Sequence, residues 1–131
     1  MKNQILLLRI AGFISLFFVV FHLLFYRMFN WENTLDGLSS VNRAIFLTYH
    51  AICILMLLFM SVIPVFQTKA LLASSIKYGI LSLFSIFYLI RIVAEFTLFG
   101  ISSSSPAILI MCLVPMIFYT IPLFSKPMVK L

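Results

Sequence analysis

Four long apolar segments alternate with short polar ones along the chain. The apolar segments cover about residues 5–26, 44–66, 78–99 and 107–124. Each is close to the ~20 residues that an α-helix needs to cross a ~30 Å hydrocarbon layer, at a rise of ~1.5 Å per residue. The pattern therefore predicts an all-α fold, an integral membrane four-helix transmembrane bundle that forms one domain over residues 1–131.

The composition agrees with a membrane protein and leaves no length for a soluble domain. Hydrophobic residues make up 64% of the chain and charged residues 9%, whereas soluble domains average about 45–50% and about 25%. The formal net charge of +6 could suggest a nucleic-acid partner. The basic residues are scattered near the helix ends and form no basic run, so we expect no nucleic-acid partner. We expect a multi-pass protein of the bacterial cytoplasmic (inner) membrane, in contact with membrane lipid.

The distribution of basic residues predicts the orientation. One side of the bundle holds both termini and the 67–77 connection, with Lys2, Arg9, Lys69, Lys77, Lys126 and Lys130. On the other side, in the 27–43 loop, Arg27 and Arg43 are offset by Glu32 and Asp36. Because short cytoplasmic loops are enriched in Lys and Arg, we expect an N-in, C-in topology with the 27–43 loop outside.

The 27–43 loop is the longest polar segment between two predicted helices. Trp31 suits an anchor at the membrane interface, and Ser39 or Ser40 can cap the second helix. Two interpretations are open: a plain connecting loop held by the tryptophan, or a lid over an outward-facing site.

Four ionisable residues, His22, His50, Arg91 and Glu95, lie in the outer halves of the apolar segments. At ~3.6 residues per turn, His22 and Glu95 lie about one turn below the outer ends of their helices, His50 about two turns and Arg91 two to three. Tyr88, Arg91 and Glu95 fall within about 60° of one helix face. We therefore predict a polar pocket in the outer half of the bilayer, with these five residues binding a ligand.

Arg91 and Glu95 stand four residues apart, so their side chains can pair along one helix. The pair can simply neutralise itself and fix helix register. Ionisable residues inside a membrane are nevertheless candidates for a functional site by default. The sequence leaves both interpretations open.

The same residues are compatible with several functions. The leading hypothesis is a site for a lipophilic or redox-type ligand such as a quinone, in which imidazoles exchange protons and Arg91 holds an anionic or carbonyl group. A metal-dependent membrane enzyme using His22, His50 and Glu95 is the first alternative, and two histidines facing each other can also hold a haem. A small transporter or proton path is the second alternative. Whether the protein is an enzyme is left open.

Partners within the membrane are also open. Ala11, Gly12 and Ser15 form a small-residue stripe that allows close helix approach, within one chain or between chains. A homo-oligomer and a subunit of a larger membrane complex are both compatible with this stripe.

Two resemblances bear on the chain. The opening ILLLRIAGFISLFFVVFHLLF resembles the first helix of DoxX-like proteins, small four-helix membrane proteins associated with redox or quinone-linked complexes, although the Gly and Lys that usually follow that helix are absent. A longer stretch, 22–96, is similar to a group of uncharacterised small bacterial membrane proteins. The shared elements are His22, Trp31-x3-Leu35, Arg43-x-Ile45-Phe46, His50 and Arg91-x3-Glu95-Phe96. That group usually has glutamine in place of Glu95, and neither resemblance implies an established activity or cofactor.

Overall fold

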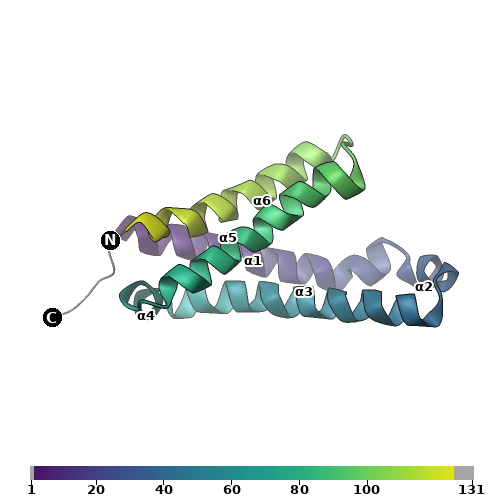
Figure 1. The fold of residues 1–131 in the computed structure, drawn as a ribbon, viewed down its shortest axis with the longest axis horizontal. Helices are drawn as coiled ribbons and strands as arrows, with labels where there is room; N and C mark the ends of the chain where they lie inside the picture. Colours follow the sequence, from purple (N-terminus) through teal and green to yellow (C-terminus); the bar gives the residue numbers. More distant parts are fainter. Residues whose placement is uncertain (1, 126–131) are drawn as a thin grey trace.

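The computed structural model describes residues 2–125 and is built from helices, with no strand in that range (Figure 1). Its four long helices are α1 (Lys2–Met28), α3 (Ser40–Phe66), α5 (Lys77–Ala94) and α6 (Ser105–Thr120). A π turn, η2 (Glu95–Phe99), continues α5, and a 3-10 turn, η3 (Ile121–Phe124), continues α6. The prediction of an all-helical fold with four apolar helices long enough to cross a membrane is confirmed.

Short helices occupy the connections that the sequence predicts as loops. They are α2 (Trp31–Thr34), the 3-10 turn η1 (Leu35–Gly37) and α4 (Thr68–Ala73). Asn30, with φ 49°, lies in the left-handed region between α1 and α2, as is common just after a helix. Ser39 is the residue that caps α3, its side chain accepting a bond of 3.3 Å from the Asn42 backbone N–H.

The long helices begin and end a few residues away from the apolar boundaries. α1 and α3 extend beyond the predicted 5–26 and 44–66 spans, because their polar ends are helical as well as their apolar middles. α6 ends earlier than the predicted 124, since the chain tightens into a 3-10 turn that contains Pro122.

The long helices form two antiparallel hairpins. α1 packs along α3 in the first hairpin, and α5 packs along α6 in the second. α1 also packs against α6, which joins the hairpins. Figure 1 shows the two hairpins close together at the end that carries α4 and diverging toward the end that carries α2. We call these the α4 end and the α2 end.

The buried side chains gather toward the α4 end. In α1 no residue after Val19 is buried, and in α3 no residue before Leu57. In α5 and η2, Glu95 is the single buried residue beyond Tyr88. Most of the fully buried core therefore lies toward the α4 end, with Cys112 of α6 extending it toward the α2 end.

Gly12 marks the closest approach of α1 and α3. A Cβ at this position would lie 2.9 Å from Val65 Cγ2, 3.1 Å from the Ser61 carbonyl oxygen and 3.2 Å from Pro64 Cβ. Small residues let the backbones of membrane helices approach in this way. The predicted small-residue stripe thus serves packing within one chain.

Four helices meet at one hydrogen-bonded joint in the core. The Ser15 hydroxyl of α1 lies 2.9 Å from the Tyr88 hydroxyl of α5 and 2.9 Å from the Tyr119 hydroxyl of α6. Tyr119 donates to the Met60 carbonyl oxygen of α3 at 2.8 Å. Ser15 also lies 3.0 Å from the Ala11 carbonyl oxygen, which is already the helical partner of the Ser15 N–H.

The donors and acceptors of the three hydroxyl groups in the joint can be assigned without conflict. If Tyr88 donates to Ser15, Ser15 to Tyr119 and Tyr119 to Met60, each hydroxyl donates once and the chain of bonds crosses all four helices. All three hydroxyl-bearing residues are buried. We refer to Ser15, Tyr88, Tyr119 and the Met60 carbonyl as the Ser15 joint.

Pro64 explains why Met60 accepts this bond. Proline has no backbone N–H, so a proline inside a helix leaves the carbonyl four residues earlier without its helical donor. Pro64 lies inside α3, four residues after Met60. In hydrocarbon such a carbonyl must find another donor within the protein. Tyr119, from α6, supplies it.

We predict that Gly12→Ala weakens the packing of α1 on α3, because the added methyl has no room at the crossing. Overpacking of this kind costs about 1–3 kcal/mol. Thermal unfolding in mild detergent should show a lower Tm. Gly79→Ala is the matched control, since a Cβ at Gly79 meets nothing within 4 Å. An equal loss of stability in both variants would contradict the prediction.

We also predict that Tyr119→Phe destabilises the protein less when Pro64 is replaced by alanine. The phenylalanine leaves the Met60 carbonyl without a donor, at a cost of about 1–3 kcal/mol, whereas Pro64→Ala restores a backbone N–H four residues away. A double-mutant cycle measured by thermal unfolding checks this. Tyr49→Phe, at an exposed tyrosine, should change neither background. An identical Tyr119→Phe effect in both backgrounds would show that the proline does not create the need for this bond.

Candidate functional site

His22 and His50 lie next to each other in the first hairpin. Their ring centroids are 5.8 Å apart and the ring planes differ by 23°. Because α1 and α3 run antiparallel, residues at similar distances from the α2 end come to the same level. The structure therefore brings together these two members of the predicted site.

Aromatic side chains surround the histidine pair. The Phe25 ring lies 4.4 Å from the His22 ring and 5.7 Å from the His50 ring, measured between centroids. Trp31 approaches His50 edge-on at 4.7 Å and Phe46 at 4.8 Å. Helix α2, which begins at Trp31, thus places the tryptophan over His50, in addition to connecting α1 with α3.

Both histidines have unused hydrogen-bonding capacity. His22 Nδ1 lies 2.8 Å from the Phe18 carbonyl oxygen, and since a carbonyl only accepts, Nδ1 carries the proton. Nε2 of the neutral His22 ring is then an acceptor. His50 Nε2 is enclosed and has no hydrogen-bond partner within residues 2–125. Buried polar atoms without partners are uncommon in native structures, so this nitrogen is a candidate for a functional role.

Arg91 and Glu95 form an ion pair at the α2 end of the second hairpin. Arg91 Nη1 donates to Glu95 Oε2 at 2.8 Å, and the Ser105 hydroxyl donates to Glu95 Oε1 at 2.6 Å. The Arg91 guanidinium carbon lies 4.5 Å from the centre of the Phe99 ring. The Glu95 carboxylate also lies beside the first turn of α6, where a negative charge is favoured by the helix dipole.

The two residues of the ion pair differ in exposure. The Glu95 side chain is 3% exposed and the Arg91 side chain 34%. Both Glu95 oxygens are occupied by bonds from the protein, so Glu95 ties α5 to α6 through Ser105. Arg91 has guanidinium nitrogens beyond Nη1 that can still donate.

The predicted metal set of His22, His50 and Glu95 is not assembled in the structure. No group of three or more His, Cys, Asp and Glu side chains within residues 2–125 lies close enough to hold a metal ion. The two histidines belong to the first hairpin and Glu95 to the second, where Ser105 and Arg91 hold it. Equal depth on two helices does not make their side chains neighbours.

Tyr88, the fifth predicted residue, belongs to the Ser15 joint. It is buried, donates or accepts at Ser15, and its ring lies 6.0 Å from the Phe18 ring of α1. It lies toward the α4 end from Arg91 on the same helix. Tyr88 thus connects the hairpins at a level closer to the α4 end than His22 and Arg91 are.

Sequence reasoning missed Ser105 and Tyr119. Ser105 lies in a serine-rich turn, and its hydroxyl accepts a bond of 2.8 Å from the Ser102 N–H while donating to Glu95. The signal for Tyr119 is indirect: Pro64 predicts a carbonyl in need of a donor, and Tyr119 is a buried hydroxyl on another helix. Both side chains are uncharged near neutral pH, so neither stands out in an apolar segment as a charged residue does.

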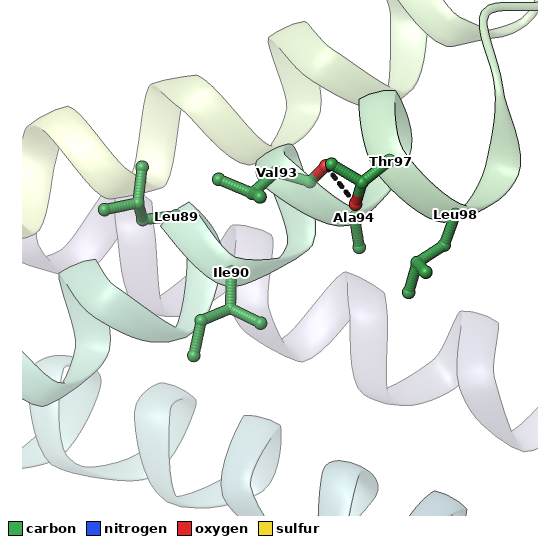
Figure 2. A pocket seen from close by; sticks show the side chains of 6 residues that line it. All are labelled: Leu89, Ile90, Val93, Ala94, Thr97 and Leu98. Atoms are coloured by element: carbon green, nitrogen blue, oxygen red, sulfur yellow. Dashed lines mark hydrogen bonds between the residues drawn. The ribbon is translucent and has the colours of Figure 1, made fainter.

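An apolar groove lies on the outer surface of α5 and η2 (Figure 2). It has a volume of about 340 Å³ and is lined by Leu89, Ile90, Val93, Ala94, Thr97 and Leu98. The hydroxyl of Thr97 is turned inward and donates to the Val93 carbonyl oxygen at 3.0 Å. The groove therefore offers hydrocarbon contact, and none of the five predicted site residues lines it.

We predict that Arg91 and Glu95 stabilise the second hairpin as a unit. Glu95→Gln and Arg91→Gln should each lower the Tm, because each leaves one charge unpaired in an apolar environment. The double variant Arg91→Gln/Glu95→Gln should lose less than the two single losses together. Asp36→Asn is the control, since its ion pair with Arg43 is exposed at both ends and exposed pairs contribute little. Additive losses at Arg91 and Glu95 would argue against the unit.

The chain was compared with known proteins. No family model, curated protein or solved structure matches it. The resemblances stated above stay predictions, and the function must be inferred from the placement and chemistry of the chain's own residues.

Proposed function

We propose that the protein crosses a membrane four times with both termini in the cytoplasm. Four helices, Lys2–Met28, Ser40–Phe66, Lys77–Phe99 and Ser105–Phe124, are long and apolar enough to do so. The basic residues outside their apolar parts favour the α4 end as the cytoplasmic one. The α2 end, with the histidine pair and the ion pair, then lies in the outer half of a bacterial inner membrane.

We further propose that the outer halves of the two hairpins bind a lipophilic or redox-type ligand. The observation that carries this proposal is that polar side-chain atoms among apolar surfaces are still free to form hydrogen bonds. His22 Nε2 and His50 Nε2 on the first hairpin make no hydrogen bond within residues 2–125, and Arg91 on the second is partly exposed. These groups lie in the half of the molecule where the helices bury few side chains.

The chemistry of these groups limits the ligand. A neutral imidazole nitrogen accepts from a hydroxyl, and a guanidinium donates to a carbonyl or an anionic oxygen. Phe25 and Trp31 already line the histidine pair, so an aromatic or extended apolar body fits there better than a hydrated one. A quinone-like molecule, with polar oxygens on an apolar ring, combines both properties.

The electrostatic coupling of Arg91 with Glu95 suits such a ligand. Because Glu95 neutralises Arg91, the pair brings little net charge to the site. A neutral polar ligand can then accept a hydrogen bond from the guanidinium without facing an unpaired positive charge. Glu95 then acts as a positioning residue for Arg91. This agrees with the glutamine that stands at the same position in the similar proteins, since an amide oxygen can also accept from Arg91.

The test is the ligand content of protein purified gently in detergent. Lipid and quinone extracts should contain a co-purifying lipophilic molecule, and His22→Phe and Arg91→Gln should each reduce its amount at least about tenfold, equivalent to about 1.4 kcal/mol of binding free energy. His22→Phe keeps a ring in the aromatic cluster while removing both nitrogens. Metal analysis and an ultraviolet-visible spectrum of the same sample examine the metal and haem alternatives.

Arg27→Ala and Thr48→Ala are the controls for this measurement. Both residues are exposed, and neither belongs to the proposed site. Undiminished ligand content in folded His22→Phe and Arg91→Gln protein would overturn the proposed site, and so would an equal loss in the controls.

A further inference from the structure

The contacts between the two hairpins are concentrated at one level. Among the side-chain hydrogen bonds of residues 2–125, those that join a helix of one hairpin to a helix of the other all belong to the Ser15 joint. Two aromatic contacts also cross between the hairpins. Phe18 meets Tyr88 at 6.0 Å, and Phe59 meets Phe84 at 5.9 Å, between ring centroids.

Each hairpin is fixed internally as far as its tip. In the first hairpin, His22 stacks beside His50, and an ion pair joins Asp36 to Arg43 at the start of α3. In the second, Ser105 bonds Glu95 near the α2 end and Lys77 Nζ donates to the Ser125 carbonyl oxygen at 2.7 Å near the α4 end. The tips thus have partners within their own hairpin.

Beyond the Ser15 joint, toward the α2 end, the helices bury little against the other hairpin. The buried residues of α1 end at Val19, and those of α3 begin at Leu57. Glu95, the buried residue farthest along the second hairpin's α5 side, is enclosed by its own hairpin through Ser105. Figure 1 shows the hairpins diverging over this part.

Each hairpin has a proline about one helical turn away from its residue in the joint. Pro64 is inside α3 and Pro115 inside α6, and both are fully buried. A proline inside a helix removes a backbone hydrogen bond and is the commonest place for a kink. The hydrogen bonds between the hairpins thus lie about one turn away from a proline in two of the four long helices.

We infer that the α2-end halves of the two hairpins open and close about the Ser15 joint, while their α4-end halves stay packed on the shared core. Motions of domains and hairpins about a few fixed contacts occur on the microsecond to millisecond scale. His22 and Arg91 stand on different hairpins, on the moving side of the joint. The movement changes the distance between them, whether or not a ligand is bound, so the inference does not rest on the proposed function.

Distance distributions between spin labels test the inference in lipid nanodiscs. The full chain with Cys53→Ser and Cys112→Ala carries labels either at Asn33 and Ser103 or at Asn3 and Ser75, all of them exposed. The first pair spans the α2 ends of the two hairpins. The second pair spans the α4 end, from the start of α1 to the turn just before α5. We expect a broad or two-peaked distribution for Asn33 with Ser103 and a narrow one for Asn3 with Ser75. Equally narrow distributions for both pairs would overturn the inference.

A substitution in the joint separates a pivot from a flexible tip. Tyr119→Phe should broaden the distance between Asn3 and Ser75, because the hairpins lose their fixed point, whereas Tyr49→Phe should leave it narrow. If Tyr119→Phe does not fold, Ser15→Ala replaces it, since that change removes the contacts to both tyrosines and keeps the bond from Tyr119 to Met60. An unchanged distribution for Asn3 with Ser75 in the folded joint variant would also overturn the inference.

Discussion

The structure depends on a carbonyl oxygen that its own helix cannot satisfy. Pro64 removes the donor that Met60 would otherwise have in α3, and an unsatisfied carbonyl is costly in an apolar interior. The Tyr119 hydroxyl of α6 takes the place of the missing N–H, and Ser15 and Tyr88 extend the contact to α1 and α5. Four helices thus meet at a carbonyl whose helical donor is missing. Pro64 also lies at the close crossing of α1 and α3, where a Cβ at Gly12 would be 3.2 Å from Pro64 Cβ.

The polar residues toward the α2 end are organised hairpin by hairpin. His22 and His50 belong to an aromatic cluster between α1, α2 and α3, while Arg91, Glu95 and Ser105 fasten α5 to α6. Each group would keep its internal contacts if the other were displaced. A site that uses both groups therefore depends on the angle between the hairpins, which the Ser15 joint controls.

The sequence predicted well what depends on local pattern. Apolar runs are enough to locate four long helices, a serine before α3 predicts its cap, and the depths of His22 and His50 place them at one level of a hairpin. The pairing of Glu95 with Arg91 follows from their spacing, but the partner of Glu95 on another helix was not predictable in the same way. Depth and helix face give the level and direction of a side chain, but the order of the helices around the bundle decides which side chain it meets. Glu95 meets Ser105, a residue of modest polarity in the adjacent turn, instead of the histidines.

In the proposed four-crossing topology, the closed ion pair of the second hairpin lowers the cost of placing its charges in hydrocarbon. Arg91 and Glu95 lie on one helix, four residues apart, and Ser105 completes their bonds from the next helix. A charged residue is costly to insert into hydrocarbon by itself, but here its counter-ion follows within the same turn of the growing chain. In the proposed topology, the α5–α6 hairpin therefore brings these two charges into hydrocarbon already paired. Because both charges lie on a single helix, four residues apart, this pair can form before the two hairpins meet.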